Sequence, residues 1–319
     1  MKVLWEKVSK PGVATKVSGA LELEGKGGKE YTVDDVKAAF AKFKPRYYAS
    51  RQEWRLAPKA GEKRGESLKG SRTLASYGLG EGATIYFKDL GPQIGYSTVF
   101  FWEYFGPMVL YPIFYAFPEV FYGAKDASSG HHLAQDLACA YWVFHYAKRI
   151  FETFFVHRFS HGTMPLRNLV KNCSYYWGYA LLVSYFLNHP MYTAPTLLAA
   201  FGDNAIYACF GLALLCQWAN FRCHVLLTRL RKPGETAYKI PRGFLFEFIT
   251  CPNYTAEILG WLFFNIGTQT LMGYAFMLSG AFQMYLWAVQ KHKRLRRQFD
   301  GKDGRPKYPR RWIIMPPFA

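Results

Sequence analysis

The chain of 319 residues carries 40 lysines and arginines against 22 aspartates and glutamates, which gives a net charge of +18. A charge of this size indicates either a nucleic-acid-binding protein or a membrane protein with basic loops. The content of 18% aromatic and 50% hydrophobic residues favours the membrane protein. The positive charges also follow the connections between apolar segments instead of forming one patch on a soluble domain, so we set a nucleic-acid role aside.

Residues 1–90 are polar and are predicted to form a small soluble domain. Residues 32–43 are typical of a helix, with Thr32 as its N-cap and acidic residues in the first turn. The order strand, strand, helix, strands is that of a β-grasp fold and resembles ubiquitin. The Gly-Gly tail of ubiquitin is absent, so no modifier function is assigned, and a generic small α+β domain is the alternative. Strands are predicted at 2–8, 20–25, 53–58 and 83–90.

Residues 91–319 are predicted to form a domain of membrane helices with a basic tail. Several apolar runs approach the roughly 20 residues that a helix needs to cross a bilayer, and a soluble core hardly supplies six in succession. The stretch 190–203 leaves a seventh segment open. The predicted fold class is therefore an α-helical multi-pass membrane protein, with six or seven transmembrane helices and an N-terminal ubiquitin-like β-grasp domain. The six segments are 98–117, 133–156, 174–190, 204–227, 244–266 and 269–289.

The distribution of charge predicts the orientation of these segments. If the N-terminal domain is cytosolic and six segments cross, the connections 157–172 and 228–243 and the tail from residue 290 are cytosolic. Basic residues gather in these three regions, whereas the opposite connections hold one lysine at most. This asymmetry agrees with the positive-inside rule.

Four glutamates fall within or beside the apolar segments. An ionisable group at membrane depth costs roughly 2.5–3.5 kcal/mol on insertion, which makes each of them a functional candidate. For Glu152 and Glu247 the favoured interpretation is a side chain that reaches the interface from the end of a segment. Glu103 lies well inside its run and Glu257 has polar neighbours, so these two are the stronger candidates.

The segment CPNYTAEILGW, residues 251–261, places an amide, a phenol and a carboxylate within about two helical turns. On a helix, Asn253 and Glu257 are i and i+4 and share a face, which Tyr254 flanks. An amide and a carboxylate can hydrogen-bond a ribose or a carboxamide, and a phenol can protonate a developing carbanion. On spacing alone, an interfacial tyrosine beside a satisfied polar pair is an equal alternative.

The basic stretch 220–243 is a second candidate site. Guanidinium groups suit phosphates, so the stretch could hold a pyrophosphate or a 2′-phosphate. The alternative is a cytosolic loop that obeys topology or touches anionic lipid. Neither GxGxxG nor GxxxxGK[ST] is present, so the phosphate would not be bound in the Rossmann or P-loop manner. The polar members are Asn220, Arg222, His224, Arg229, Arg231, Lys232, Tyr238, Lys239 and Arg242.

No metal site is predicted. His157 and His161 are spaced as i and i+4, but no HExxH motif and no third ligand accompany them in the sequence. The six cysteines form no paired CxxC pattern, so we interpret them as reduced packing residues.

Longer blocks of sequence point to a family. LRKPGETAYKIPRGFLFEFITCPNYTAEILGW and the ending KHKRLRRQF…YPRRWIIMPPF resemble the steroid 5α-reductase superfamily. The ubiquitin-like start, KDLGPQIGYSTVFFWEYFGP and RIFETFFVHRFSHGTMPLRN resemble its branch of very-long-chain trans-2-enoyl-CoA reductases. The resemblance covers essentially the whole chain and implies that residues 91–319 are the catalytic domain.

This resemblance implies NADPH-dependent reduction of the 2,3 double bond of a trans-2-enoyl-CoA, the last step of fatty-acid elongation, at the endoplasmic reticulum membrane. It implies Tyr254 as the proton donor to C2 after hydride delivery to C3, and Glu103 as a carboxylate near the reacting carbonyl. The partners it implies are the very-long-chain enoyl-CoA substrate, membrane lipid and other elongation enzymes. The residues it implies for NADPH are Asn220, Arg231, Tyr238, Lys239, Asn253 and Glu257.

Two other functions stay open at this point. The chain could be a steroid or polyprenol reductase of the same superfamily. It could also be a non-catalytic membrane scaffold whose ubiquitin-like domain recruits elongation enzymes.

Overall fold

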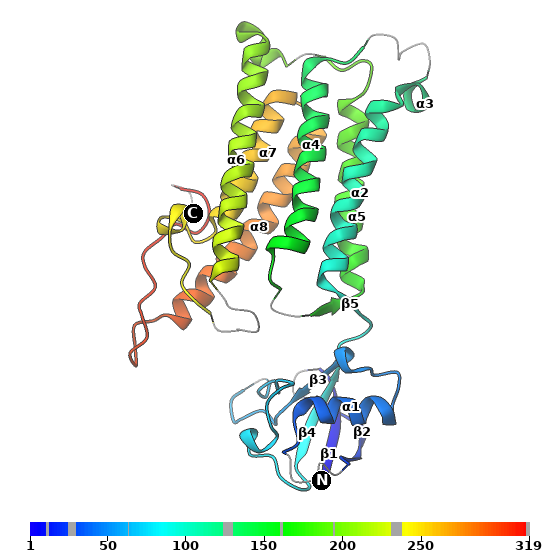
Figure 1. The fold of residues 1–319 in the computed structure, drawn as a ribbon, viewed down its shortest axis with the longest axis vertical. Coiled ribbons are helices and arrows are strands. Elements are labelled where there is room, and N and C mark those ends of the chain that lie inside the picture. The colour runs from blue at the N-terminus through cyan, green and yellow to red at the C-terminus, as the bar shows by residue number, and fades with distance from the viewer. Residues whose placement is uncertain are drawn as a thin grey trace. The chain divides into compact units, whose positions relative to one another are not determined.

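The structure is a computed structural model in which residues 1–10, 13–24, 30–62, 64–123, 130–159, 162–193, 195–230 and 238–316 are described. The chain divides into two compact units, drawn in Figure 1. Unit 1 comprises residues 1–95 and 162–168, and unit 2 comprises residues 96–161 and 169–319.

Unit 1 contains a four-stranded mixed sheet with one helix packed against it. The strand order is β2-β1-β4-β3, in which β1 and β4 are parallel and the other neighbours are antiparallel. A separate antiparallel pair, β5 and β6, completes the unit. The elements are β1 (Lys2–Lys10), β2 (Val13–Glu22), α1 (Val33–Phe43), β3 (Gln52–Arg55), β4 (Thr84–Asp89), β5 (Gln93–Gly95), β6 (Thr163–Pro165) and the 3₁₀ turns Ala49–Arg51 and Ala75–Tyr77.

The core of unit 1 follows from the alternation in its sequence. Along β1 the buried side chains are Val3 and Trp5, whereas Leu4 between them points outward. Phe40 of α1 packs edge-on against Trp5, with ring centroids 5.0 Å apart. Thr32 caps α1 as predicted. The β-grasp prediction is confirmed, except that β2 begins at Val13, earlier than the predicted strand.

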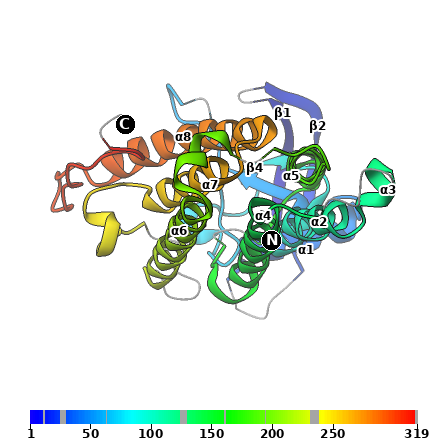
Figure 2. The same cartoon turned by 90° about the horizontal axis from the view of Figure 1, so that it is seen from above.

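Unit 2 is built from long helices that run side by side in Figure 1. Seen from above in Figure 2, α7 lies beside α6 and α8, and both pairs are in contact. The interior is aromatic and includes Tyr111, Trp142, Trp261 and Phe276. The elements are α2 (Tyr96–Ala116), α3 (Pro118–Tyr122), α4 (Leu133–Phe151), a π-helical turn (Glu152–Val156), α5 (Arg167–Leu187), α6 (Asp203–Arg229), α7 (Pro252–Thr268), α8 (Leu271–Gln298) and the 3₁₀ turns Thr196–Phe201 and Phe244–Glu247.

The predicted apolar segments correspond to helices, with one correction. The segment 244–266 is not one helix, because Gly243 and Phe244 have positive φ angles of 83° and 51° and the chain forms a 3₁₀ turn before α7 begins at Pro252. The stretch 190–203 contributes the short 3₁₀ turn Thr196–Phe201. In the ranges given above, no helix is at once long enough and apolar enough to cross a membrane. The multi-pass membrane fold therefore stays a prediction.

Candidate active site

Three of the predicted site residues meet where α6 packs against α7. The amide nitrogen of Asn220 donates to the backbone oxygen of Asn253 and to Oε2 of Glu257, each at 3.0 Å. Asn220 and Asn253 are buried. The Oδ1 atom of Asn253 is buried and has no hydrogen-bond partner among the described residues. Asn220, from a distant part of the chain, therefore contacts both residues that the spacing placed on one face of α7.

Two cations from the last turn of α4 join this cluster. The Nζ atom of Lys148 donates to Oδ1 of Asn220 at 2.6 Å and lies 3.1 Å from Oε1 of Glu152. Arg149 donates to Oε2 of Glu152 at 2.7 Å. Nδ1 of His224 lies 3.0 Å from Oε1 of Glu152. Lys148, Arg149, Glu152 and Glu257 thus form one charge-balanced group, with Glu152 fully buried at its centre.

Glu152 differs from its predicted position. We expected its side chain to reach the interface from a segment end, but its side chain is 0% exposed and both of its oxygens are taken by cations or an imidazole. The π-helical turn begins at this residue, and such turns are frequent at functional sites. Glu247 is closer to expectation, because its side chain is 42% exposed and pairs with Arg242 at 3.3 Å.

Glu103 and Tyr254 occupy different surroundings. Glu103 is buried in α2 and accepts a hydrogen bond of 2.9 Å from Asn172. Tyr254 is half-buried, packs against the cluster around Cys251, and lies with its ring centroid 6.4 Å from that of Trp287. The described residues offer no hydrogen bond to the Tyr254 hydroxyl and none between Tyr254 and Glu103.

The remaining predicted cofactor residues lie in the basic stretch. Arg231 falls outside the described residues. Tyr238 and Lys239 are exposed, and Arg294 of α8 donates to the Tyr238 hydroxyl at 3.0 Å. This contact links the basic stretch to the basic end of α8. The sequence predicts both regions on the cytosolic side of the membrane.

Sequence reasoning missed several members of the site. Arg149 donates to the hydroxyl of Tyr104, the residue after Glu103, at 2.8 Å. This arginine therefore links α2 to the group around Glu152. The Tyr146 hydroxyl is buried without a hydrogen-bond partner in the described ranges. The signal for the cations was present, because Lys148 and Arg149 precede Glu152 by four and three residues, the spacing of intrahelical ion pairs.

One group of side chains in the described part of the chain is compact enough for a metal ion. Glu152, His157 and His224 each offer a ligand atom, all within 4.8 Å of one another. Burial lowers the pKa of His157 to about 3, so its ring is neutral. A metal ion here would nevertheless meet the positive charges of Lys148 and Arg149 at short range, which is unfavourable. We therefore assign no metal to this group.

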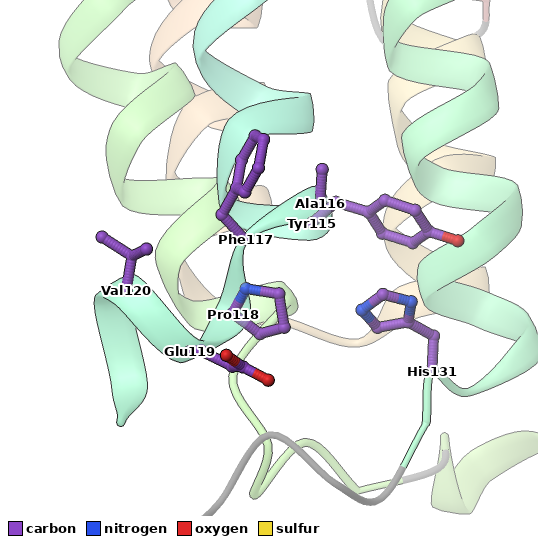
Figure 3. A pocket seen from close by; sticks show the side chains of 7 residues that line it. All are labelled: Tyr115, Ala116, Phe117, Pro118, Glu119, Val120 and His131. Carbon is purple, nitrogen blue, oxygen red and sulfur yellow. The ribbon is translucent and has the colours of Figure 1, made fainter. Parts of the chain in front are cut away.

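A pocket of about 590 Å³ lies elsewhere, around the end of α2 and α3, and is drawn in Figure 3. Its lining includes Glu119, His131 and Tyr115, and the last two rings are stacked with centroids 4.0 Å apart. It contains none of the predicted site residues.

Comparisons with known proteins agree with the resemblance seen in the sequence. Residues 162–319 match the family described as 3-oxo-5-alpha-steroid 4-dehydrogenase, and residues 22–89 match the domain described as TECR, ubiquitin-like domain. A very-long-chain enoyl-CoA reductase of Dictyostelium discoideum is 49% identical over 253 residues, 79% of this chain and 80% of that protein.

Two further relatives are similar over larger shares of the chain. A Caenorhabditis elegans protein named probable very-long-chain enoyl-CoA reductase is 41% identical over 308 residues, 94% of each chain. A human protein named trans-2,3-enoyl-CoA reductase-like is 37% identical over 276 residues, 84% of this chain and 73% of that protein.

Proposed function

The chain belongs to the family of very-long-chain enoyl-CoA reductases, and we propose that it reduces the 2,3 double bond of a trans-2-enoyl-CoA with NADPH. This would be the last step of the fatty-acid elongation cycle. The observation that carries the proposal is the buried cluster of Asn220, Asn253 and Glu257, which leaves a polar atom without a partner.

The cluster fits a nicotinamide cofactor. The Oδ1 atom of Asn253 is a buried acceptor without a donor in the described ranges, and an unpaired buried polar group is costly unless a ligand supplies its partner. An amide or hydroxyl donor, as in a carboxamide or a ribose, would satisfy it. Asn220, Asn253 and Glu257 would hold this part, and Arg231, Tyr238 and Lys239 would contact the phosphates. When bound, the cofactor supplies a hydride to C3 of the substrate.

Tyr254 is the proposed proton donor to C2. Reduction at C3 leaves negative charge on the thioester side, and a phenol can give up its proton to the carbon that carries this charge. The half-buried Tyr254 hydroxyl makes no hydrogen bond within the described residues, so it is available to a substrate. Glu103, held by Asn172, is the proposed carboxylate near the reacting carbonyl.

We also propose that unit 2 is embedded in the endoplasmic reticulum membrane, with unit 1 and the C-terminal tail in the cytosol. Large apolar side chains are exposed on the outside of several helices, and so many on one unit fit a surface that faces lipid. Examples on α5, α6 and α8 are Phe186, Leu215, Trp218, Leu278 and Phe282, which are all 48% exposed or more. Membranes extracted with alkaline carbonate should retain the chain, and its release into the supernatant would contradict this location.

The decisive experiment follows NADPH oxidation by the detergent-purified chain on addition of a long-chain trans-2-enoyl-CoA. Wild type should turn over. Tyr254→Phe should bind NADPH but lose about 10²- to 10⁴-fold in kcat, the typical contribution of a general acid. Tyr285→Phe, which removes a hydroxyl from a 42% exposed tyrosine of α8, is the matched control and should keep full activity.

The other outcomes separate the alternatives. Full activity in Tyr254→Phe would keep the reaction and move the proton donor elsewhere, with Glu103 tested next. A wild type that binds NADPH but ignores enoyl-CoA would favour a steroid or polyprenol substrate. A wild type that does not bind NADPH would favour a scaffold for elongation enzymes.

A further inference from the structure

Three buried side chains, Tyr141 and His145 of α4 and Gln217 of α6, form a chain that ends on the Glu257 carboxylate of α7. The amide nitrogen of Gln217, on α6, donates to the Tyr141 hydroxyl at 2.6 Å and lies 2.8 Å from Nδ1 of His145, on α4. The other ring nitrogen of His145, Nε2, faces Oε1 of Glu257 at 3.4 Å. Gln217 and His145 are only 2% and 3% exposed, so water does not compete for the contact between them.

This arrangement defines the tautomer of His145. The orientation of Gln217 gives both of its amide hydrogens an acceptor, one on Tyr141 and one on Nδ1 of His145. The Glu257 carboxylate, 3.4 Å from Nε2, can only accept, which favours a proton on Nε2 and agrees with this orientation of the amide. Because Nδ1 accepts, the single ring proton of neutral His145 is on Nε2, the nitrogen that faces Glu257.

The ring has little freedom to leave this position. The Trp261 ring lies edge-on to it with centroids 4.8 Å apart, and the Tyr146 ring does the same at 4.9 Å. The carboxylate of Glu257 is thus approached from two sides. Asn220 donates to Oε2, and Nε2 of His145 lies 3.4 Å from Oε1.

We propose that Gln217 and His145 are positioning residues for Glu257. Gln217 holds the imidazole as the Nε2–H tautomer, and that N–H group fixes the orientation of the carboxylate that meets the cofactor. The inference rests on the proposed function, in which Glu257 contacts NADPH. Neither residue touches the reacting atoms, so its loss should weaken cofactor binding and leave the chemical step of the bound complex nearly unchanged.

The test compares two replacements of His145 in the full-length chain in detergent. His145→Phe keeps a ring but removes the donor, whereas His145→Gln keeps an N–H donor near the position of Nε2. In metal sites, loss of a residue that orients a ligand typically lowers affinity or activity by a factor of about 10 to 100. We expect KM and Kd for NADPH to rise about 10- to 100-fold in His145→Phe with kcat within about threefold of wild type, and His145→Gln to restore most of the affinity. His189→Phe, a half-buried histidine that packs on Tyr122, is the matched control and should leave both constants unchanged.

A second measurement follows the proton itself. Nitrogen NMR of the chain labelled with ¹⁵N-histidine, with the His145 signals identified by their loss in His145→Gln, should show the neutral Nε2–H form in wild type. Gln217→Leu should change that signal and raise the Kd for NADPH. A proton on Nδ1, a doubly protonated ring, or equal NADPH affinity in His145→Phe and His145→Gln would overturn the inference.

The two proposals fail in different ways. If wild type binds NADPH but reduces no enoyl-CoA, the proposed reaction fails, and the Kd comparison still decides the role of His145. If wild type turns over and His145→Phe loses kcat with no change in KM, the reaction stands and the positioning role is wrong.

Discussion

The two units bury aromatic cores of similar kind but treat charge differently. Unit 1 keeps the carboxylates of its ion pairs at the rim, as with Asp89, whose side chain is 22% exposed beside that of Arg51 at 11%. Its buried polar side chain among the described residues is neutral Gln52, which is fully hydrogen-bonded. Unit 2 buries Glu152 completely and surrounds it with Lys148 and Arg149.

This difference separates the charges that folding alone explains from those that it does not. Burying a pair of charges often costs more in lost hydration than the attraction returns, so a well-packed apolar group would serve stability at least as well. The rim charges of unit 1 fit a domain that needs only to fold. The interior charges of unit 2 are explained if they hold Asn220 and Glu257 in place for a ligand.

The largest expected effect on stability comes from breaking the buried charges of unit 2. Glu152→Ala leaves Lys148 and Arg149 buried without their carboxylate and should lower the free energy of unfolding by about 3–5 kcal/mol. Chemical denaturation in detergent, followed by helical circular dichroism, would measure it. The matched control is Glu119→Ala, which removes an exposed glutamate of α3 and should change the free energy by less than about 0.5 kcal/mol. Equal stability of the two variants would remove the contrast between the units.

A smaller effect is expected from packing in unit 2, where charge plays no part. A Cβ atom at Gly106 of α2 would overlap the indole ring of Trp177, which donates to the backbone oxygen of Trp102 at 2.9 Å. Gly106→Ala should therefore destabilise unit 2 by about 1–3 kcal/mol. Gly178→Ala in α5 is the matched control, because its Cβ would meet nothing within 4 Å. That substitution should stabilise the helix by about 0.5–1 kcal/mol. A loss of stability in Gly178→Ala would contradict the attribution of the Gly106→Ala effect to the clash with Trp177.

Much of the fold could be predicted because its determinants are local. The alternation around Trp5 and the cap at Thr32 are signals within a few residues of the chain. The same holds for the half of the site that lies on α7, where the four-residue spacing of Asn253 and Glu257 already placed both on one face. Local backbone exceptions were missed, as at Phe244, where a positive φ angle in a residue other than glycine delays α7.

The other half of the site could not be predicted, because it depends on contacts between distant segments. Asn220 is 72 residues from Lys148 and 37 from Glu257, and only the packing of α4, α6 and α7 brings them together. Glu152 was interpreted as an interfacial side chain because its sequence position near a segment end says nothing about its partner His224. Arg149 likewise reaches Tyr104 across 45 residues.

Within unit 1, the helix cap offers a prediction of intermediate size. The Thr32 hydroxyl accepts from the backbone nitrogen of Asp35 at 3.4 Å, and the Asp35 carboxylate accepts from the backbone nitrogen of Thr32 at 2.7 Å. Thr32→Ala should lower the stability of unit 1 by about 1 kcal/mol, whereas Thr32→Ser, which keeps the hydroxyl, should not. Hydrogen exchange of the α1 amides in the full chain would measure both. A larger loss in Thr32→Ser than in Thr32→Ala would rule out the cap as the cause.

The smallest effect concerns the rim ion pair of unit 1 and its dependence on pH. Arg51 donates to both oxygens of Asp89, at 2.5 Å and 2.8 Å, and this hydrogen bonding holds the pKa of Asp89 below its usual value. A carboxyl whose pKa is lowered by folding stabilises the protein above its unfolded pKa of about 3.9, and this contribution is lost as the pH falls through the folded pKa. Asp89→Asn should therefore cost about 0.2–1 kcal/mol at pH 7, as rim ion pairs do, and progressively less below pH of about 4.

Hydrogen exchange of the β4 amides, corrected for the intrinsic rate at each pH, would follow this difference between Asp89→Asn and wild type. Glu62→Gln, which replaces an exposed carboxylate of the same unit, is the matched control and should leave the exchange of the β4 amides unchanged. The contrast with Glu152 becomes sharper if Asp89→Asn costs less than about 1 kcal/mol at pH 7. The ion pair at the rim of unit 1 would then contribute little to stability, whereas the fold of unit 2 would depend on its buried carboxylate. A cost at pH 7 as large as that of Glu152→Ala would mean that unit 1 also depends on charge for its fold, and exposure alone would no longer separate the two units.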